Sequence, residues 1–343
     1  MLRLIAGLAL CLALPALAFS TTIRVPEDTA SIPAAIGLAG EGDTVLVAPG
    51  TYHGRCLIQF KNIVLRGAMG AAATTLDGQS TGNVITAHGV GRSTIIEDLT
   101  IMGGSATQPE SVGAAVYINE ASPTLQRCRL VNNSARNGGG VAAYFFSEPL
   151  IRDCFIGNND GGAIVIETNT GSAGTSAAEI YNTVMAHNSG YGVWVLRGAR
   201  VTMRNCTIAY NNGDGLRAEK EARVTMKKCI VSNNAGGGVV RYDNTVCYAL
   251  ECNDVYRNSA GGYLGSNPFD PCFPGRGAGD VDLSPCYQNA VQDDFHLQPG
   301  SQLCLLRETC GVLGAFADPC ETGGCCVTAV THTTWGGVKD LYR

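Results

Sequence analysis

Four segments decide the fold: QRCRLVNN (126–133), IRDCFIGNN (151–159), MRNCTIAYNN (203–212) and MKKCIVSNN (226–234). In each of them an asparagine follows a cysteine by five positions, and an apolar residue follows the same cysteine by two. Such self-similarity is typical of repeat proteins, in which each unit buries its apolar face only by stacking on the next unit. We therefore expect a stack of similar units.

The alignment extends beyond these four segments. Its asparagine column contains Asn133, Asn159, Asn188, Asn211, Asn234 and Asn258. After a glycine-rich turn, a second column is apolar, and it contains Val116, Val141, Ile164, Val193, Leu216, Val239 and Tyr263. The steps between its members are 25, 23, 29, 23, 23 and 24 residues. Because insertions fall in the turns while the columns keep register, the pattern predicts a solenoid.

Within each unit the apolar residues alternate, as Val193 and Val195 do around Trp194, and no helical stripe is sustained. Units of this length with short strands predict an all-β parallel β-helix, whose strands pair with equivalents about 4.8 Å away. We interpret the asparagine column as a structural ladder at a bend, where asparagine tolerates left-handed backbone and stacked amides hydrogen-bond. Glycan attachment at Asn132 or Asn205 is the alternative.

Composition excludes several protein classes. The chain has 343 residues, of which 45% are hydrophobic, 15% charged and 7% aromatic, with 44 glycines and a formal net charge of −5. These values argue against a coiled coil, a disordered chain and a multi-span membrane protein. Since no basic stripe stands out, we expect no nucleic-acid partner. We expect a monomer.

The first 18 residues are typical of a secretory signal peptide. Arg3 precedes the apolar run 4–14, and residues 15–18 end in a small-residue cleavage site. The run is shorter than the roughly 20 apolar residues of a membrane-spanning helix. We expect cleavage after Ala18, export, no transmembrane span, and a secreted or cell-surface location. Fourteen of the 15 cysteines would remain, in a compartment that permits disulfides.

The repeats resemble the right-handed parallel β-helix superfamily of secreted bacterial proteins, the pectate-lyase-like fold. Residues 31–39 look like its N-terminal capping helix, and residues 42–52 look like its first strand and turn. The resemblance covers residues 22–318 and implies the handedness. It predicts a β-helix with its N-terminal cap over 19–265, a cysteine-rich closing segment over 266–326 and a tail over 327–343. The family includes polysaccharide lyases, glycoside hydrolases, sugar epimerases and adhesins.

Nine cysteines lie between Cys247 and Cys326, where core-forming residues are sparse. We expect disulfides there, with Cys247–Cys252, Cys272–Cys286 and Cys304–Cys310 as the local pairs, although sequence alone does not fix connectivity. The cysteines of the repeats, such as Cys128 and Cys229, are expected to be buried free thiols. No cofactor is expected, and no metal, because the chain has no CxxC pair and its histidines are scattered. The tail is either a sorting or docking signal or a frayed terminus.

Two outward rows on the second strand of each unit carry the candidate binding residues. These are Tyr117, Tyr144, Trp194, Arg217 and Tyr242. Aromatic faces beside charged groups suit sugar rings, whose C–H faces stack while their hydroxyls hydrogen-bond. Glu167 and Glu219 lie two units apart, about 9.6 Å between backbones, and are weak catalytic candidates at the separation of an inverting glycosidase.

Three functions stay open on sequence alone. The first is a non-catalytic module that binds polysaccharide or a cell-surface glycan on this face. The second is a polysaccharide lyase or glycoside hydrolase, although the acidic Ca²⁺ ligands of the lyases and the aspartate triplets of the hydrolases are not found. The third is a structural, adhesin-like surface protein.

Overall fold

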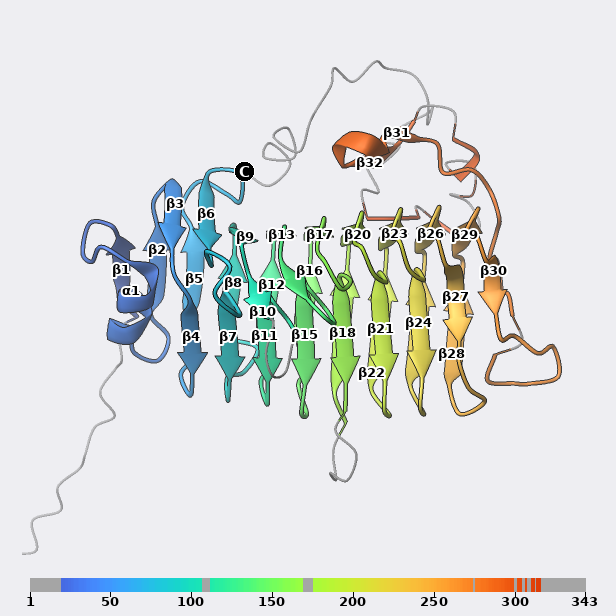
Figure 1. Cartoon of the computed structure of the whole chain (residues 1–343), viewed down its shortest axis with the longest axis horizontal. Coiled ribbons are helices and arrows are strands. Elements are labelled where there is room, and N and C mark those ends of the chain that lie inside the picture. Colours follow the sequence, from blue (N-terminus) through green and yellow to red (C-terminus); the bar gives the residue numbers. More distant parts are fainter. Residues whose placement is uncertain are drawn as a thin grey trace, which may run out of the picture.

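The computed structural model describes residues 20–106, 112–168, 175–273, 275–298, 301–303, 306, 310–311 and 313–315. Figure 1 shows a long solenoid whose coils follow one another along a single axis. The expected signal peptide, Cys304 and the tail lie outside the described residues. No helix in the described part of the chain is long and apolar enough to cross a membrane.

Three parallel sheets, here called A, B and C, form the sides of the solenoid. Sheet A contains β1 (Thr22–Val25), β2 (Thr44–Val47), β5 (Val64–Gly67), β8 (Ile95–Glu97), β12 (Thr124–Gln126), β16 (Leu150–Arg152), β19 (Ala177–Tyr181), β22 (Arg200–Arg204), β25 (Arg223–Lys227) and β28 (Cys247–Glu251). Sheet B contains β3 (Gly50–His53), β6 (Thr74–Asp77), β9 (Thr100–Met102), β13 (Arg129–Val131), β17 (Phe155–Gly157), β20 (Val184–Ala186), β23 (Thr207–Ala209), β26 (Ile230–Ser232) and β29 (Asp254–Tyr256).

Sheet C contains β4 (Cys56–Gln59), β7 (Ile85–His88), β11 (Val116–Asn119), β15 (Val141–Tyr144), β18 (Ile164–Glu167), β21 (Val193–Leu196), β24 (Leu216–Glu219), β27 (Gly237–Arg241) and β30 (Gly261–Leu264). A short pair, β10 (Ser105–Ala106) with β14 (Ser134–Ala135), lies in the turns. Each strand pairs in parallel with its equivalent one coil away, as Val193 with Leu216. The predicted all-β parallel β-helix is confirmed.

The predicted inward column is confirmed residue by residue. Strand pairing aligns Val116, Val141, Ile164, Val193, Leu216, Val239 and Tyr263. All of these except Tyr263 are fully buried. The turn before this column requires glycine, because a Cβ on Gly192 would lie 2.3 Å from Ile208 Cγ2 and one on Gly215 2.5 Å from Val231 Cγ1. The glycine-rich turns thus let each coil close tightly around the core.

The asparagine ladder is also present. Each side-chain amide donates to the amide oxygen of the next asparagine along the axis, at 2.8–3.1 Å, from Asn133 to Asn258. The left-handed backbone lies one position earlier than expected, as at Tyr210 (φ 55°) before Asn211 and Asn233 (φ 56°) before Asn234. The ladder asparagines are therefore needed for their amides, and the residue before each one makes the bend.

The repeat cysteines behave as predicted. Cys128, Cys154, Cys206 and Cys229 are buried free thiols, and so is Cys56 in an earlier coil. Burial raises the pKa of the Cys154 and Cys206 thiols well above the ordinary value. Thr183 takes the place of cysteine in its coil, and its hydroxyl accepts from the Cys154 backbone N–H at 3.4 Å. These side chains are small core residues.

At the N-terminal end, α1 (Ile32–Leu38) covers the first coil and buries Ile32, Ala35 and Ile36. Ser31 caps it, accepting from the Ala34 N–H at 3.3 Å, and Pro33 lies in its first turn. The predicted helix at 31–39 is confirmed. The first strand of sheet A is β1, which precedes the helix, whereas the family resemblance implied that the first strand, within residues 42–52, follows it.

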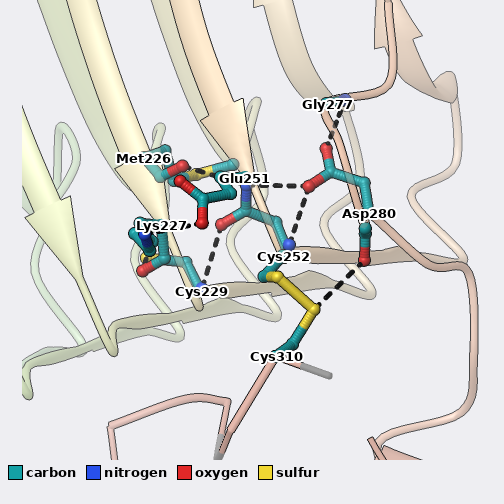
Figure 2. The surroundings of a disulfide bond; sticks show 10 residues. Met226, Lys227, Cys229, Glu251, Cys252, Gly277, Asp280 and Cys310 are labelled. Carbon is teal, nitrogen blue, oxygen red and sulfur yellow. Dashed lines mark hydrogen bonds and ion pairs between the residues drawn. A yellow bond between two sulfur atoms is a disulfide. The ribbon is translucent and has the colours of Figure 1, made fainter.

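Both disulfides of the described residues join segments that the sequence does not place together. They are Cys247–Cys272 and Cys252–Cys310, so all three expected local pairs are wrong. Cys286 is an exposed free thiol. Cys247 and Cys252 are only five positions apart, but Cys247 begins β28 and Cys252 follows its last residue, and they bond to different parts of the closing segment. Figure 2 shows Cys252 bonded to Cys310, beside the Lys227–Glu251 ion pair.

The closing segment has two parts. Residues 267–273 and 275–281 lie against the last coil. Phe273 is fully buried there, and the centroid of its ring lies 4.5 Å from that of Tyr248. Beyond them, β31 (Tyr287–Asn289), the 3₁₀ turn η1 (Ala290–Gln292) and β32 (Asp294–Leu297) turn back along the outer face of sheet B (Figure 1). This second part buries outward residues of sheet B, including Phe155, Val184 and Ile230. Part of one face of the solenoid is therefore covered by its own chain.

Candidate functional site

The predicted ligand-binding residues lie on the outer face of sheet C. Strand pairing aligns Tyr117, Ala142, Val165, Trp194, Arg217 and Val240 in one outward row, and Asn119, Tyr144, Glu167, Leu196 and Glu219 in another. Tyr242 directly follows β27 and its backbone N–H donates to the Ala218 carbonyl at 3.1 Å. The structure therefore brings the five predicted binding residues and the two glutamates onto one face.

Several of these outward residues are not exposed, contrary to our expectation. Ala142 and Val165 are fully buried, and only 8% of Glu167 is exposed. The covering groups are aromatic side chains that fold over the strands, namely Tyr117, Tyr144, Tyr191 and Trp194. With Tyr242, these four side chains are called the aromatic patch below. The outer face of sheet C is thus a second apolar layer rather than a bare sheet.

Trp194, Arg217 and Tyr242 form an ordered stack at one end of the patch. The Arg217 guanidinium carbon lies 3.8 Å from the centroid of the Tyr242 ring and 4.9 Å from that of Trp194. The Trp194 indole N–H donates to Glu219 Oε1 at 2.7 Å, and Arg217 Nη2 lies 3.6 Å from the same oxygen. These contacts hold both ring planes, and Tyr242 remains 52% exposed.

At the other end of the patch the tyrosines pack against one another. The rings of Tyr117 and Tyr144 are 6.2 Å apart, and those of Tyr191 and Trp194 meet edge to face at 5.1 Å. Burial, with Glu167 beside it, raises the pKa of Tyr144 above its usual range. Sequence analysis missed Tyr191, because it lies in a glycine-rich turn and not in a strand row. The motif Tyr-Gly-Val-Trp (191–194), a large aromatic beside the turn glycine, is the signal that could have indicated it.

Both glutamates are engaged by neighbouring side chains. Arg197 contacts Glu167 directly, and Tyr144 lies beside the same carboxylate. Glu219 accepts from Trp194 and lies beside Arg217. The two carboxylates lie in one row with Leu196 between them, so their backbones are about 9.6 Å apart. Each acid thus orders side chains of its own part of the patch.

A second polar cluster lies between sheet B and the closing segment. His187 Nε2 lies 2.8 Å from the Ala290 carbonyl and 3.8 Å from Asp293, and Arg129 lies 3.6 Å from Asp293. Burial raises the pKa of Asp254 to about 7, and its Oδ1 accepts from the Leu283 N–H at 2.9 Å. These groups attach the closing segment to the sheet.

Across the described parts of the chain, no three histidine, cysteine or acidic side chains gather as a metal site would require.

One stretch of the chain matches the model of a described family. Residues 171–268 match the family model of the right handed beta helix region. No curated protein matches the sequence. The family match agrees with the strand pairing of these coils, so this part of the solenoid is a right-handed β-helix.

Several solved structures resemble the chain at low identity. One is pectate lyase Pel9A, with 14% identity and a TM-score of 0.49, where the match covers 69% of this chain and 65% of that one. Another is the pectin methylesterase from carrot, with 14% identity and a TM-score of 0.45, where the match covers 78% of this chain and 88% of that one. A third is the A-module of the mannuronan C-5 epimerase AlgE6 from Azotobacter vinelandii, with 14% identity and a TM-score of 0.37, where the match covers 75% of this chain and 96% of that one. The chain spans less than two thirds of the pectate lyase.

Proposed function

We propose that this protein is an exported, non-catalytic module that binds a polysaccharide through the aromatic patch of sheet C. The observation that carries the proposal is the Trp194–Arg217–Tyr242 stack, in which two ring planes are held in place on a partly exposed face. A sugar presents apolar C–H faces to aromatic rings, and a ring that is already fixed loses little conformational entropy on binding.

The surroundings of the two glutamates favour binding over hydrolysis. A general acid and a general base each need a carboxyl group free to exchange a proton with the substrate or with water. Glu167 is nearly buried between Arg197 and Tyr144, and Glu219 accepts the indole N–H of Trp194. Both carboxylates therefore serve to position neighbouring side chains, and the patch acts as a surface for recognition.

Export is supported by covalent structure and by sequence. Two disulfides staple the C-terminal part of the solenoid, and disulfides persist mainly in oxidising compartments. The first 18 residues have the pattern of a signal peptide. A secreted or cell-surface module would meet polysaccharides in that location.

The test is a glycan-array screen followed by calorimetric titration of the best glycan. Trp194→Ala and Tyr242→Ala should each weaken binding at least tenfold, whereas Phe269→Ala, which removes a 92% exposed aromatic elsewhere, should not. Glu219→Gln keeps an acceptor for the indole and should retain most of the affinity. Equal binding by all variants would refute the site.

Catalysis is tested in parallel with reducing-sugar and unsaturated-product assays on every glycan that binds. We expect binding without turnover. Turnover that Glu167→Gln or Glu219→Gln abolishes would overturn the proposal in favour of a glycoside hydrolase or polysaccharide lyase.

A further inference from the structure

The outer face of sheet A carries a group of cations that the linear sequence separates. In β22 and β25, strand pairing aligns Arg200 with Arg223, Thr202 with Thr225 and Arg204 with Lys227. The two threonines form a central row, and long cationic side chains flank this row on both sides. These six residues are called the basic strip. Sequence analysis found no basic stripe because the strip is formed by two separate segments, RVTMR and RVTMK.

The cations of the strip are largely available to a ligand. Arg200, Arg204 and Arg223 are exposed. Lys227 pairs with Glu251 at 2.6 Å, but no acidic group of the described residues lies within ion-pair distance of the three arginines. The nearest acid along the threonine row, Glu179, pairs instead with Arg92 at 2.6 Å. The strip is thus a local positive surface on a chain whose net charge is −5.

The arrangement is unfavourable for stability alone. Directly opposed residues of neighbouring strands lie about 4.8 Å apart, and like charges in such positions destabilise a sheet. Arg200 opposes Arg223, and Arg204 opposes Lys227. An anion bound between them would remove this repulsion, so the strip favours a negatively charged partner.

We infer that the basic strip is a second binding site, for a linear polysaccharide that carries carboxylates. A chain lying along the solenoid axis over Thr202 and Thr225 would have cations on both sides, since four residues of strand separate the two flanking rows by about 13 Å. Arginine binds carboxylate through paired N–H donors, and the threonine hydroxyls can hydrogen-bond to sugar hydroxyls. One pair of cations per coil suits one charge per sugar better than the denser charge of a nucleic acid.

The site lies on a different sheet from the aromatic patch, so each can be disabled alone. The probe is polygalacturonate, and fully methyl-esterified polygalacturonate is the matched uncharged polymer. The test variant is Arg200→Gln/Arg223→Gln. Its control is Arg136→Gln/Lys220→Gln, which removes the same charge from exposed turn positions.

We expect the unmodified protein to bind polygalacturonate with an affinity that falls as salt is added, and not to bind the methyl ester. The test variant should bind at least tenfold more weakly, while the control binds as the unmodified protein does. Because the test variant loses a like-charge contact, its thermal midpoint should not fall, which separates lost binding from unfolding. Equal losses in both double variants, binding of the methyl ester, or equal affinity for a DNA oligonucleotide would overturn the inference.

Discussion

Substituting Asn211 by alanine should destabilise the solenoid far more than its size suggests. Its Oδ1 accepts from the backbone N–H and the side-chain amide of Asn188, at 3.1 and 2.9 Å. Its own amide donates to the Met185 carbonyl at 3.0 Å and to Asn234 Oδ1 at 2.9 Å. The residue is 1% exposed, so water does not replace these four bonds.

The cost can be estimated from the groups that lose partners. The Asn188 backbone N–H loses its acceptor in a buried turn, which costs about 1–3 kcal/mol. The two bonds donated by Asn211 add about 1 kcal/mol each. The Asn188 amide keeps the Ile156 and Ala186 carbonyls at 3.1 and 3.2 Å, so it adds little. We therefore expect a loss of roughly 3–5 kcal/mol in the free energy of unfolding.

The measurement is urea unfolding followed by circular dichroism, with Asn212→Ala as the control. Asn212 is the next residue and is exposed, so its substitution should change stability by less than about 0.5 kcal/mol. The comparison holds if both variants unfold with the slope of the unmodified protein, since coils can unfold separately in repeat proteins. If Asn211→Ala lost no more stability than Asn212→Ala, the ladder would not stabilise the solenoid and the reasoning would be wrong.

Three further predictions concern the closing segment and the thiols. Because burial raises the folded-state pKa of Asp254 to about 7, above the unfolded value near 3.9, the unfolded state releases this proton first. The free energy of unfolding should therefore fall as the pH rises from 4 to 7, by roughly 4 kcal/mol at most. Asp254→Asn should flatten this fall when unfolding is measured as a function of pH. An unchanged pH profile in this variant would contradict the assignment. Replacing Cys252 and Cys310 by serine should lower the free energy of unfolding by up to about 4 kcal/mol, and limited proteolysis should then cut first within residues 275–298. A first cut inside the coils would show that the disulfide does not hold this segment. Among the cysteines that the structure describes, Cys286 should react with a thiol reagent in the native protein, and the five buried thiols only after denaturation; native labelling of Cys206 or Cys229, measured by peptide mass, would contradict their burial.

The residues that face the core could be predicted because every coil repeats the same packing requirement. A side chain that faces the core must fit those directly above and below it, so Val193, Leu216 and Val239 form a visible column. The asparagine ladder was predictable for the same reason. The position of the left-handed residue was not, since Tyr210, Asn233 and His187 share no side-chain chemistry and only the backbone is the same.

The disulfides could not be predicted from spacing. Cys252 and Cys310 are separated by 58 residues, and they meet because the closing segment turns back along sheet B. The signal for this return was present in the strands of sheet B, such as Phe155–Gly157 and Val184–Ala186. Their side chains are buried on both faces, whereas those of sheet A, such as Arg223–Lys227, alternate. Continuously apolar strands are expected where both faces of a sheet are covered.

The outward residues therefore distinguish the three faces, and this difference bears on function. Several strands of sheet B carry apolar outward residues that the closing segment covers, so these residues stabilise the chain itself. Sheet C bears the aromatic patch, whose stack at Trp194 leaves Tyr242 exposed. Sheet A bears three exposed arginines, Arg200, Arg204 and Arg223, that form no ion pair with an acid of the described residues. Neither of these features is needed to close a coil, because the inward columns and the ladder already do so. If both faces bind polysaccharide, Trp194→Ala and Arg200→Gln/Arg223→Gln should abolish different interactions and leave the unfolding transition in place. Loss of both interactions in either variant would mean that the two faces do not act as separate sites.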